Sequence, residues 1–166
     1  MNNIEIMEDK YIIHAYTDGS CSKSGKTVLC GYGIYFPNRE LPNVSQKMDI
    51  KPLTNQRAEL YAIYKAIKLT SDACKFDKLI IFSDSEYSIK SVTVWIKAWK
   101  KNGWKNSKKE PVKNQDIIQL IDDLLVLNKG KIIFKHVKAH TGKLDTDSIC
   151  NDIADGLAKS GAAGLS

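Results

Sequence analysis

Long apolar runs are missing from this 166-residue chain. No run approaches the roughly 20 residues of a membrane-spanning helix, so we expect no membrane span and no membrane partner. The first ten residues are acidic and polar, unlike the basic and then apolar start of a signal peptide. We therefore expect an intracellular protein of the cytoplasm or the nucleus.

Cysteine is also scarce, with four residues in the chain. They form no CxxC pair and have no spacing typical of a zinc site, which excludes the common cysteine-based zinc modules. We predict that all four are reduced and unpaired thiols: Cys21, Cys30, Cys74 and Cys150.

Positive charge, in contrast, is in excess. Lysine and arginine together number 25 against 19 acidic residues, and the formal net charge of +6 favours an anionic partner such as nucleic acid or an anionic surface. The length and an apolar content of 43% indicate one globular domain. We expect an N-terminal lead at 1–10, the folded domain at 11–160 and a flexible tail of small residues at 161–166.

Two apolar segments end in the same way. Residues 11–17 form a β-branched and aromatic run before Asp18, and residues 79–83 form an apolar run before Asp84. We expect Gly19 to break the first strand into a turn, and an Asp-Gly pair by itself is also a common plain turn. If the two strands are parallel neighbours, Asp18 and Asp84 lie side by side at the edge where α/β sheets bind ligands.

The spacing of the strands predicts a mixed α/β sheet in a single domain. A polar loop at 19–27 and short connections indicate an antiparallel meander of the first three strands, and helical crossovers favour parallel pairing of the last two. The inferred strand order is 3-2-1-4-5, flanked by helices. The five predicted strands are 11–17, 31–36, 44–50, 79–83 and 131–137. The predicted helices are 56–69, 85–91, 93–101, 117–127 and 148–160.

Two further acidic residues lie on predicted helices. Glu59 shares the inward face of its helix with Ile63 and Ala66, which is costly unless a positive group meets it. A first-turn glutamate favoured by the helix dipole is the alternative. Asp155 lies on the flank of the apolar stripe of the last helix, together with Asn151.

A basic segment at 100–109 holds five lysines and Trp104. Such runs are usually solvated surfaces, but lysine mixed with tryptophan also suits phosphate attraction with base or sugar stacking. Of the three histidines, His14 and His136 lie inside strands, where packing explains them. His140 lies in a polar loop at 138–148, either as an ordinary surface histidine or in a functional role.

Six segments together resemble type 1 ribonuclease H, of the cellular and viral forms. They follow one another in the family's order and cover nearly the whole chain: 16–19 (YTDG), 54–60 (TNQRAEL), 83–85 (SDS), 99–104 (WKKNGW), 137–142 (VKAHTG) and 151–155 (NDIAD).

The resemblance implies the ribonuclease H-like fold and a set of site residues. The implied ligands of two Mg²⁺ ions, with Mn²⁺ as a substitute, are Asp18, Glu59, Asp84 and Asp155, and the implied mobile catalytic histidine is His140. The implied substrate-binding residues are Ser24, Thr54, Asn55, Gln56, Tyr87, Trp95, Trp99, Lys100, Lys101 and Asn114. Thr54 and Asn114 correspond to residues that hold a phosphate of the DNA strand.

Two positions depart from the family pattern. Pro52 stands where some relatives carry a phosphate-binding arginine, and the stretch from His140 to Asp155 is longer than in many relatives.

The function implied by the resemblance is endonucleolytic hydrolysis of the RNA strand of an RNA–DNA hybrid by a monomer, leaving 5′-phosphate and 3′-hydroxyl ends. Carboxylate oxygens suit Mg²⁺, and two ions activate water and stabilise the leaving oxygen. The alternatives are another metal nuclease or integrase on this fold, and a hybrid-binding module without catalysis.

Overall fold

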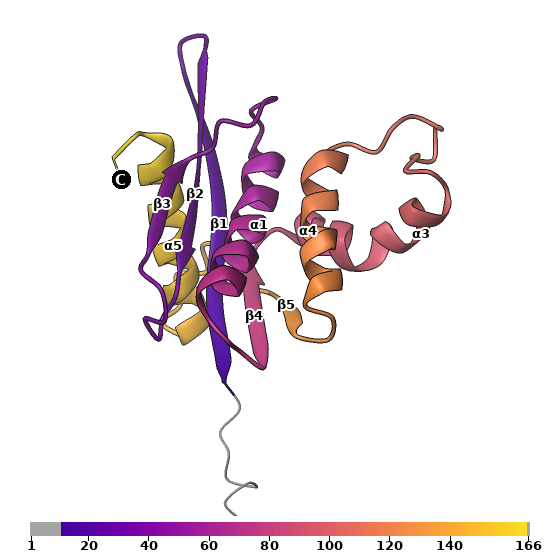
Figure 1. Cartoon of the computed structure of the whole chain (residues 1–166). Coiled ribbons are helices and arrows are strands. Elements are labelled where there is room, and N and C mark those ends of the chain that lie inside the picture. The colour runs from indigo at the N-terminus through magenta and orange to yellow at the C-terminus, as the bar shows by residue number, and fades with distance from the viewer. Residues whose placement is uncertain (1–10, 166) are drawn as a thin grey trace, which may run out of the picture.

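The computed structural model describes residues 11–165, and the predicted lead at 1–10 lies outside them. Its centre is a five-stranded sheet in the order β3-β2-β1-β4-β5, which confirms the predicted topology (Figure 1). No helix in this part of the chain is long and apolar enough to cross a membrane. The strands are β1 (Ile12–Ser24), β2 (Thr27–Tyr35), β3 (Val44–Lys47), β4 (Lys78–Ser83) and β5 (Ile132–His136).

Strand β1 is much longer than predicted. The expected turn at Gly19 and loop at 19–27 are wrong, because β1 continues to Ser24 and pairs with β2 up to a tight turn at Gly25, which has φ +64°. Gly19 is needed for close packing. A Cβ atom there would lie 2.3 Å from the backbone nitrogen of Glu59.

The parallel part of the sheet is shorter than β1. Strands β1 and β4 pair in parallel from Ile12↔Lys78 to Thr17↔Ser83, and β4 pairs in parallel with β5. Beyond Thr17, β1 keeps a neighbour only on the β2 side. This step in the sheet leaves one edge of β1 open at Asp18 and Gly19.

Helices cover both faces of the sheet. Helices α1 and α4 pack over the main hydrophobic core, and α5 packs against β1, β2 and β3 on the other face (Figure 1). The helical segments are α1 (Asn55–Ala73), α2 (Glu86–Lys90), the π-helical turn η2 (Ser91–Trp95), α3 (Ile96–Lys101), α4 (Gln115–Leu127) and α5 (Thr146–Ala162). Segments α2, η2 and α3 follow one another without the predicted break, and the basic segment at 100–109 begins in the last turn of α3.

Helix α5 approaches β2 closely because glycines face it. A Cβ atom at Gly33 would lie 2.5 Å from the carbonyl oxygen of Ala154. At its C-terminal end, α5 approaches β3 equally closely, because Gly161 of the helix lies against the backbone of Gln46. Ala162 is buried there. Helix α5 therefore ends at Ala162, two residues beyond the predicted helix at 148–160.

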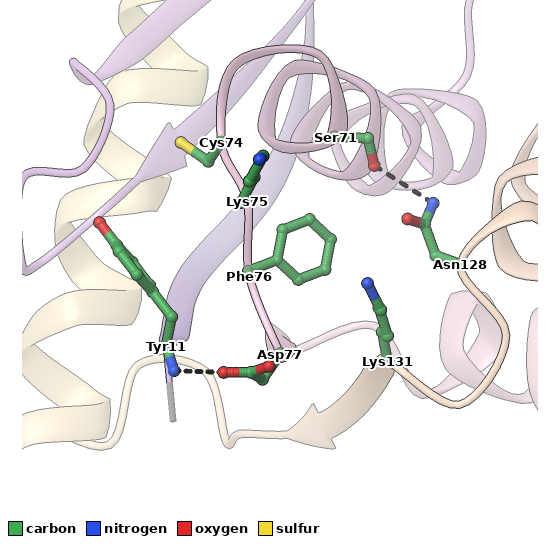
Figure 2. A pocket seen from close by; sticks show the side chains of 8 residues that line it. All are labelled: Tyr11, Ser71, Cys74, Lys75, Phe76, Asp77, Asn128 and Lys131. Atoms are coloured by element: carbon green, nitrogen blue, oxygen red, sulfur yellow. Dashed lines mark hydrogen bonds between the residues drawn. The ribbon is translucent and has the colours of Figure 1, made fainter. Parts of the chain in front are cut away.

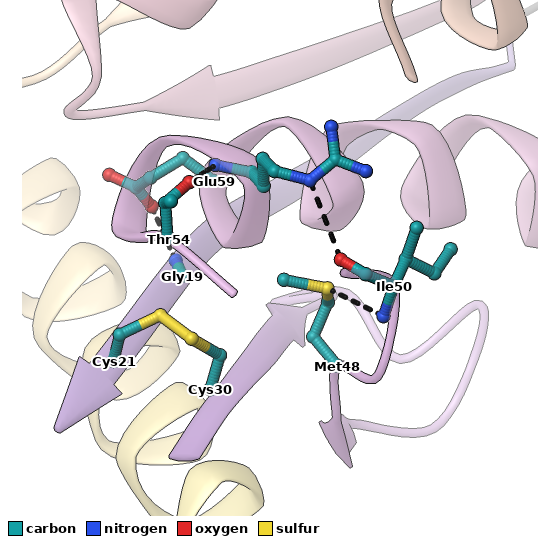
Figure 3. The surroundings of a disulfide bond; sticks show 8 residues. Gly19, Cys21, Cys30, Met48, Ile50, Thr54 and Glu59 are labelled. Atoms are coloured by element: carbon teal, nitrogen blue, oxygen red, sulfur yellow. Dashed lines mark hydrogen bonds between the residues drawn. A yellow bond between two sulfur atoms is a disulfide. The ribbon is translucent and has the colours of Figure 1, made fainter. Parts of the chain in front are cut away.

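The prediction of four free thiols is also wrong. Cys21 and Cys30 form a disulfide across the β1–β2 hairpin, with their Cα atoms 4.0 Å apart (Figure 3). The hairpin register places them directly opposite each other, at a pair where the side chains of antiparallel strands lie closest. Cys74 and Cys150 are free, half-buried and buried respectively.

Candidate active site

Carboxylates from three elements meet where the parallel part of the sheet ends. Asp18 lies one residue beyond the last β1–β4 pair, Asp84 directly follows β4, and Glu59 comes from the second turn of α1. One oxygen from each side chain lies within 4.8 Å of the others. Asp18 and Glu59 are only 4% and 7% exposed, so the cluster is largely removed from solvent.

Glu59 is held in place by the open edge of β1. The backbone N–H of Gly19 donates a hydrogen bond to Oε1 of Glu59 (Figure 3). Thr54 begins the helix, because its hydroxyl accepts a hydrogen bond from the backbone N–H of Arg57 at 3.2 Å. The cap thus fixes the start of the helix that carries Glu59, and the hydrogen bond from Gly19 holds its carboxylate against β1.

Burial and crowding change the acidity of two of these carboxyls. Burial, with smaller contributions from Asp84 and Asp155, raises the pKa of Asp18 to about 8, against an opposing effect of its hydrogen bond with Glu59. Burial and the neighbouring Asp18 raise the pKa of Glu59 well above its usual range. Such a cluster is held against its own repulsion, and a bound divalent cation relieves that repulsion.

The third carboxylate, Asp84, is oriented by two residues that the sequence did not assign to the site. The side-chain amide of the buried Asn151 donates to Oδ2 of Asp84 at 3.2 Å. Nε2 of His136 lies 3.3 Å from the carbonyl oxygen of Asp84. The prediction that His136 is packed is therefore wrong: its side chain is exposed at the end of the edge strand β5, whereas His14 is half-buried against Phe82.

Asp155 and His140 line the same open groove as the cluster. The groove has a volume of about 280 Å³, and Asp155 enters it from α5, where Oδ2 also pairs with Nζ of Lys159 at 3.0 Å. His140 is exposed, with φ +51°. The residues that line this groove are Asp18, Gly19, Ser20, Asn55, Glu59, Asp84, Ala139, His140 and Asp155.

The donor set fits a divalent metal ion. Four carboxylates from separate elements offer hard oxygen ligands around one groove, with open solvent on one side for waters and a phosphate. Asp18, Glu59 and Asp84 form the compact part, and Asp155 stands beside Asp18 in the same groove.

The predicted DNA-binding residues form a second groove beside the first. Gln56, Tyr87 and Trp99 line a space of about 270 Å³ with Asn106, Val112 and Lys113. Tyr87, Trp95, Trp99 and Trp104 continue as a row of rings with centroids 5.9–6.1 Å apart from one ring to the next. Such a row offers stacking surfaces for sugars or bases.

The remaining predicted contacts differ in their surroundings. Nζ of Lys100 pairs with Oδ2 of Asp122 on α4 at 2.7 Å, whereas Lys101 is exposed at the end of α3. Ser24 lies at the tip of the β1–β2 hairpin and does not line either groove.

A larger pocket lies at the opposite end of the parallel strands, where β1, β4 and β5 begin (Figure 2). Its volume is about 560 Å³, and its lining includes Tyr11, Phe76, Asp77 and Lys131. Its polar groups bond to one another, as in the bond from the backbone N–H of Tyr11 to Asp77 at 2.7 Å. None of the residues predicted for the site lies there.

The strand order, the short parallel pairing and the carboxylate cluster at its end define the ribonuclease H-like class of α/β proteins. A family model described as RNase H matches residues 10–163. The chain therefore belongs to the RNase H family.

Individual relatives agree with this assignment. A probable ribonuclease H of Acanthamoeba polyphaga mimivirus is 39% identical over 162 residues, covering 95% of this chain and 67% of the relative. The ribonuclease H of Schizosaccharomyces pombe is 41% identical, over 89% of this chain and 52% of its own length. The chain thus spans only about half to two thirds of these two relatives.

Solved structures of viral proteins share the fold. The solution structure of the PFV RNase H domain matches with a TM-score of 0.75 and 28% identity, covering 95% of this chain and 98% of that one. A foamy viral protease-reverse transcriptase in complex with an RNA/DNA hybrid matches with a TM-score of 0.76 and 26% identity, over 93% of this chain and 20% of that one.

Proposed function

We propose that this chain is an Mg²⁺-dependent endonuclease that hydrolyses the RNA strand of RNA–DNA hybrids and leaves 5′-phosphate and 3′-hydroxyl ends. The observation that carries the proposal is the carboxylate cluster of Asp18, Glu59 and Asp84 within 4.8 Å, set in a family whose members are ribonucleases H. The foamy viral relative that binds an RNA/DNA hybrid supports the choice of substrate.

The four carboxylates share one role in the proposed mechanism, which is to hold metal ions. Asp18, Glu59, Asp84 and Asp155 would hold two divalent ions, which supply an activated water and charge stabilisation for displacement at phosphorus. Gly19 and Asn151 keep Glu59 and Asp84 oriented through hydrogen bonds. The groove is open to solvent, so a phosphate can reach the carboxylates from its rim.

His140 and the second groove complete the proposal. An exposed imidazole at the rim can move a proton at the leaving oxygen or assist product release without holding metal. Tyr87, Trp95 and Trp99 would seat the DNA strand, and Thr54 and Asn114 would hold one of its phosphates. We propose further that the chain acts as a monomer inside the cell.

One assay tests the activity. The protein is incubated with Mg²⁺ and four labelled substrates: a hybrid, an RNA duplex, a DNA duplex and single-stranded RNA. The expected result is cleavage of the RNA strand in the hybrid alone, lost on chelation, with ends confirmed by phosphatase and ligase treatment. Asp84→Asn is the control, because it removes a ligand charge at nearly constant volume and should bind hybrid without cleaving it.

Other outcomes distinguish the alternatives. Wild-type binding without cleavage would support a hybrid-binding module, and cleavage of a DNA duplex would support another metal nuclease of this fold. Asp84→Asn retaining more than a few per cent of wild-type turnover would overturn the assignment of the metal site.

A further inference from the structure

We infer that Arg57 is a positioning residue that assembles the DNA-phosphate contact of this enzyme from three separate segments of the chain. The inference rests on the proposed function, in which Thr54 and Asn114 hold a phosphate of the DNA strand. Arg57 is the one residue within the described range that forms hydrogen bonds with both: its backbone N–H donates to Oγ1 of Thr54 at 3.2 Å, and its guanidinium donates to Oδ1 of Asn114 at 3.4 Å.

The guanidinium of Arg57 has an acceptor for each of its five N–H groups. Nε donates to the carbonyl of Ile50, and Nη2 donates to the carbonyl of Lys51. Both terminal nitrogens bond to Asp116 at 2.8 Å in a bidentate pair. With the bond to Asn114, the side chain joins the turn before α1 to the start of α4. A planar, fork-shaped donor suits this task, and lysine cannot reproduce it.

The contact with Arg57 also fixes which way the amide of Asn114 faces. An arginine has no acceptor, so the oxygen of Asn114 must face it. The NH₂ group then faces outward, where one N–H donates to the hydroxyl of Tyr87 at 2.9 Å. The second N–H remains for a phosphate oxygen. The backbone of Asn114 is left-handed, with φ +64°, directly before α4. The bonds to Arg57 and Tyr87 hold its side chain in place.

Arg57 itself does not bind the phosphate. Its side chain is 3% exposed, and its charge is paired with Asp116, so it supports the contact from behind. Pro52, at the position of a phosphate-binding arginine in some relatives, contributes neither a charge nor a backbone N–H. The phosphate contact of this chain therefore depends on two neutral side chains, and their geometry depends on Arg57.

Kinetics on substituted hybrids tests the inference. The hybrids carry a single uncharged methylphosphonate, moved one position at a time along the DNA strand. For wild type and for Lys68→Ala, one position should raise KM several-fold. Lys68 is the matched control, because it forms an exposed ion pair with Asp72 on the same helix α1. In Asn114→Ala this position-specific effect should disappear.

Arg57→Lys should behave like Asn114→Ala. We expect KM on the unmodified hybrid to rise about five- to tenfold, kcat to stay within about twofold, and the methylphosphonate effect to fall below about twofold, because the variant impairs the binding geometry alone. The double variant should be no worse than Asn114→Ala alone, because both changes act on the same phosphate contact. Asp116→Asn, a milder change at an exposed residue, should give a smaller shift in the same direction if Arg57→Lys does not fold.

Specific results would overturn the inference. An Arg57→Lys or Asp116→Asn variant with an unchanged KM and the full methylphosphonate effect would show that Arg57 only stabilises the fold. A double variant in which the two effects on KM add up would also show that Arg57 acts independently of the Asn114 contact. If wild type binds the hybrid without cleaving it, the proposed activity fails, and the same scan read as hybrid Kd still decides the role of Arg57.

Discussion

Replacing Asp18 with asparagine should stabilise the metal-free protein at neutral pH while abolishing cleavage. The carboxyl of Asp18 is almost fully buried, and burial raises its pKa to about 8 from the ordinary 3.8. A carboxyl with a raised pKa in the folded state opposes folding once it must ionise. Below about pH 4 the carboxyl is neutral in both the folded and the unfolded state, so it costs no stability. Between about pH 4 and pH 8 it ionises in the unfolded chain but stays protonated in the folded one, so the free energy of unfolding falls progressively as the pH rises towards 8.

The size of the effect follows from the difference between the two pKa values. Each pH unit between the unfolded and the folded pKa costs about 1.4 kcal/mol of folding free energy. At pH 7 this amounts to about 4 kcal/mol as an upper limit, because a groove open to solvent lets the side chain partly rehydrate. We expect Asp18→Asn to be more stable than wild type by about 2–4 kcal/mol at pH 7 and by about 1–2 kcal/mol at pH 5.

Urea unfolding in EDTA at several pH values between about 5 and 8 measures this difference, with the disulfide intact in both proteins. Asp72→Asn on α1 is the control, since its carboxylate is exposed and its variant should follow the wild-type pH profile. Adding Mg²⁺ should stabilise wild type and leave Asp18→Asn nearly unchanged, because the variant lacks a ligand charge. A difference that does not vary with pH, or a variant less stable than wild type at pH 7, would refute the reasoning.

Three other predictions concern the basic segment, the histidine and the disulfide. Replacing Lys100, Lys101, Lys105 and Lys108 with alanine should weaken hybrid binding and reduce the slope of log Kd against log salt concentration by about 0.7–0.9 for each lysine that binds a phosphate. Lys100→Ala alone should have the smallest effect, because Lys100 pairs with Asp122. An unchanged slope in filter binding would mean that these lysines form a solvated surface. His140→Ala should slow turnover by about ten- to a hundredfold at nearly constant affinity, and wild-type steady-state rates would place His140 outside the chemistry. Cys21→Ser with Cys30→Ser should lower the free energy of unfolding by about 2–3 kcal/mol, and thiol titration of unreduced, unfolded wild type should find two free thiols rather than four.

The patterns in the sequence were sufficient for the strand order and for placing Asp18 beside Asp84, whereas Glu59 and Asp155 were assigned to the site through the resemblance to type 1 ribonuclease H. Alternation and β-branched runs mark strands, and the helical period marks α1 and α5. An aspartate directly after each of the two paired parallel segments brings Asp18 beside Asp84. These features depend on residues close together in the chain and on a topology with few alternatives.

The missed features depend on register and on contacts between distant residues. The Cys21–Cys30 disulfide follows from the hairpin register, and a two-residue turn between Ser24 and Thr27 would have revealed it, but the polar composition of 19–27 suggested a loop. In the same way, the polar run could not show that β1 extends beyond its pairing with β4. The N–H of Gly19 is therefore free of β4 and donates to Glu59.

Only the tertiary structure decided which polar groups orient the site. Asn151 reaches Asp84 across 67 positions of sequence, and Arg57 reaches Asn114 across 57. No local pattern encodes such a pair, because a buried donor needs an acceptor at one point in space, whatever its place in the chain. The sequence thus determined the fold and the chemical groups of the site, whereas packing of α1, α4 and α5 on the sheet determined how those groups are aimed.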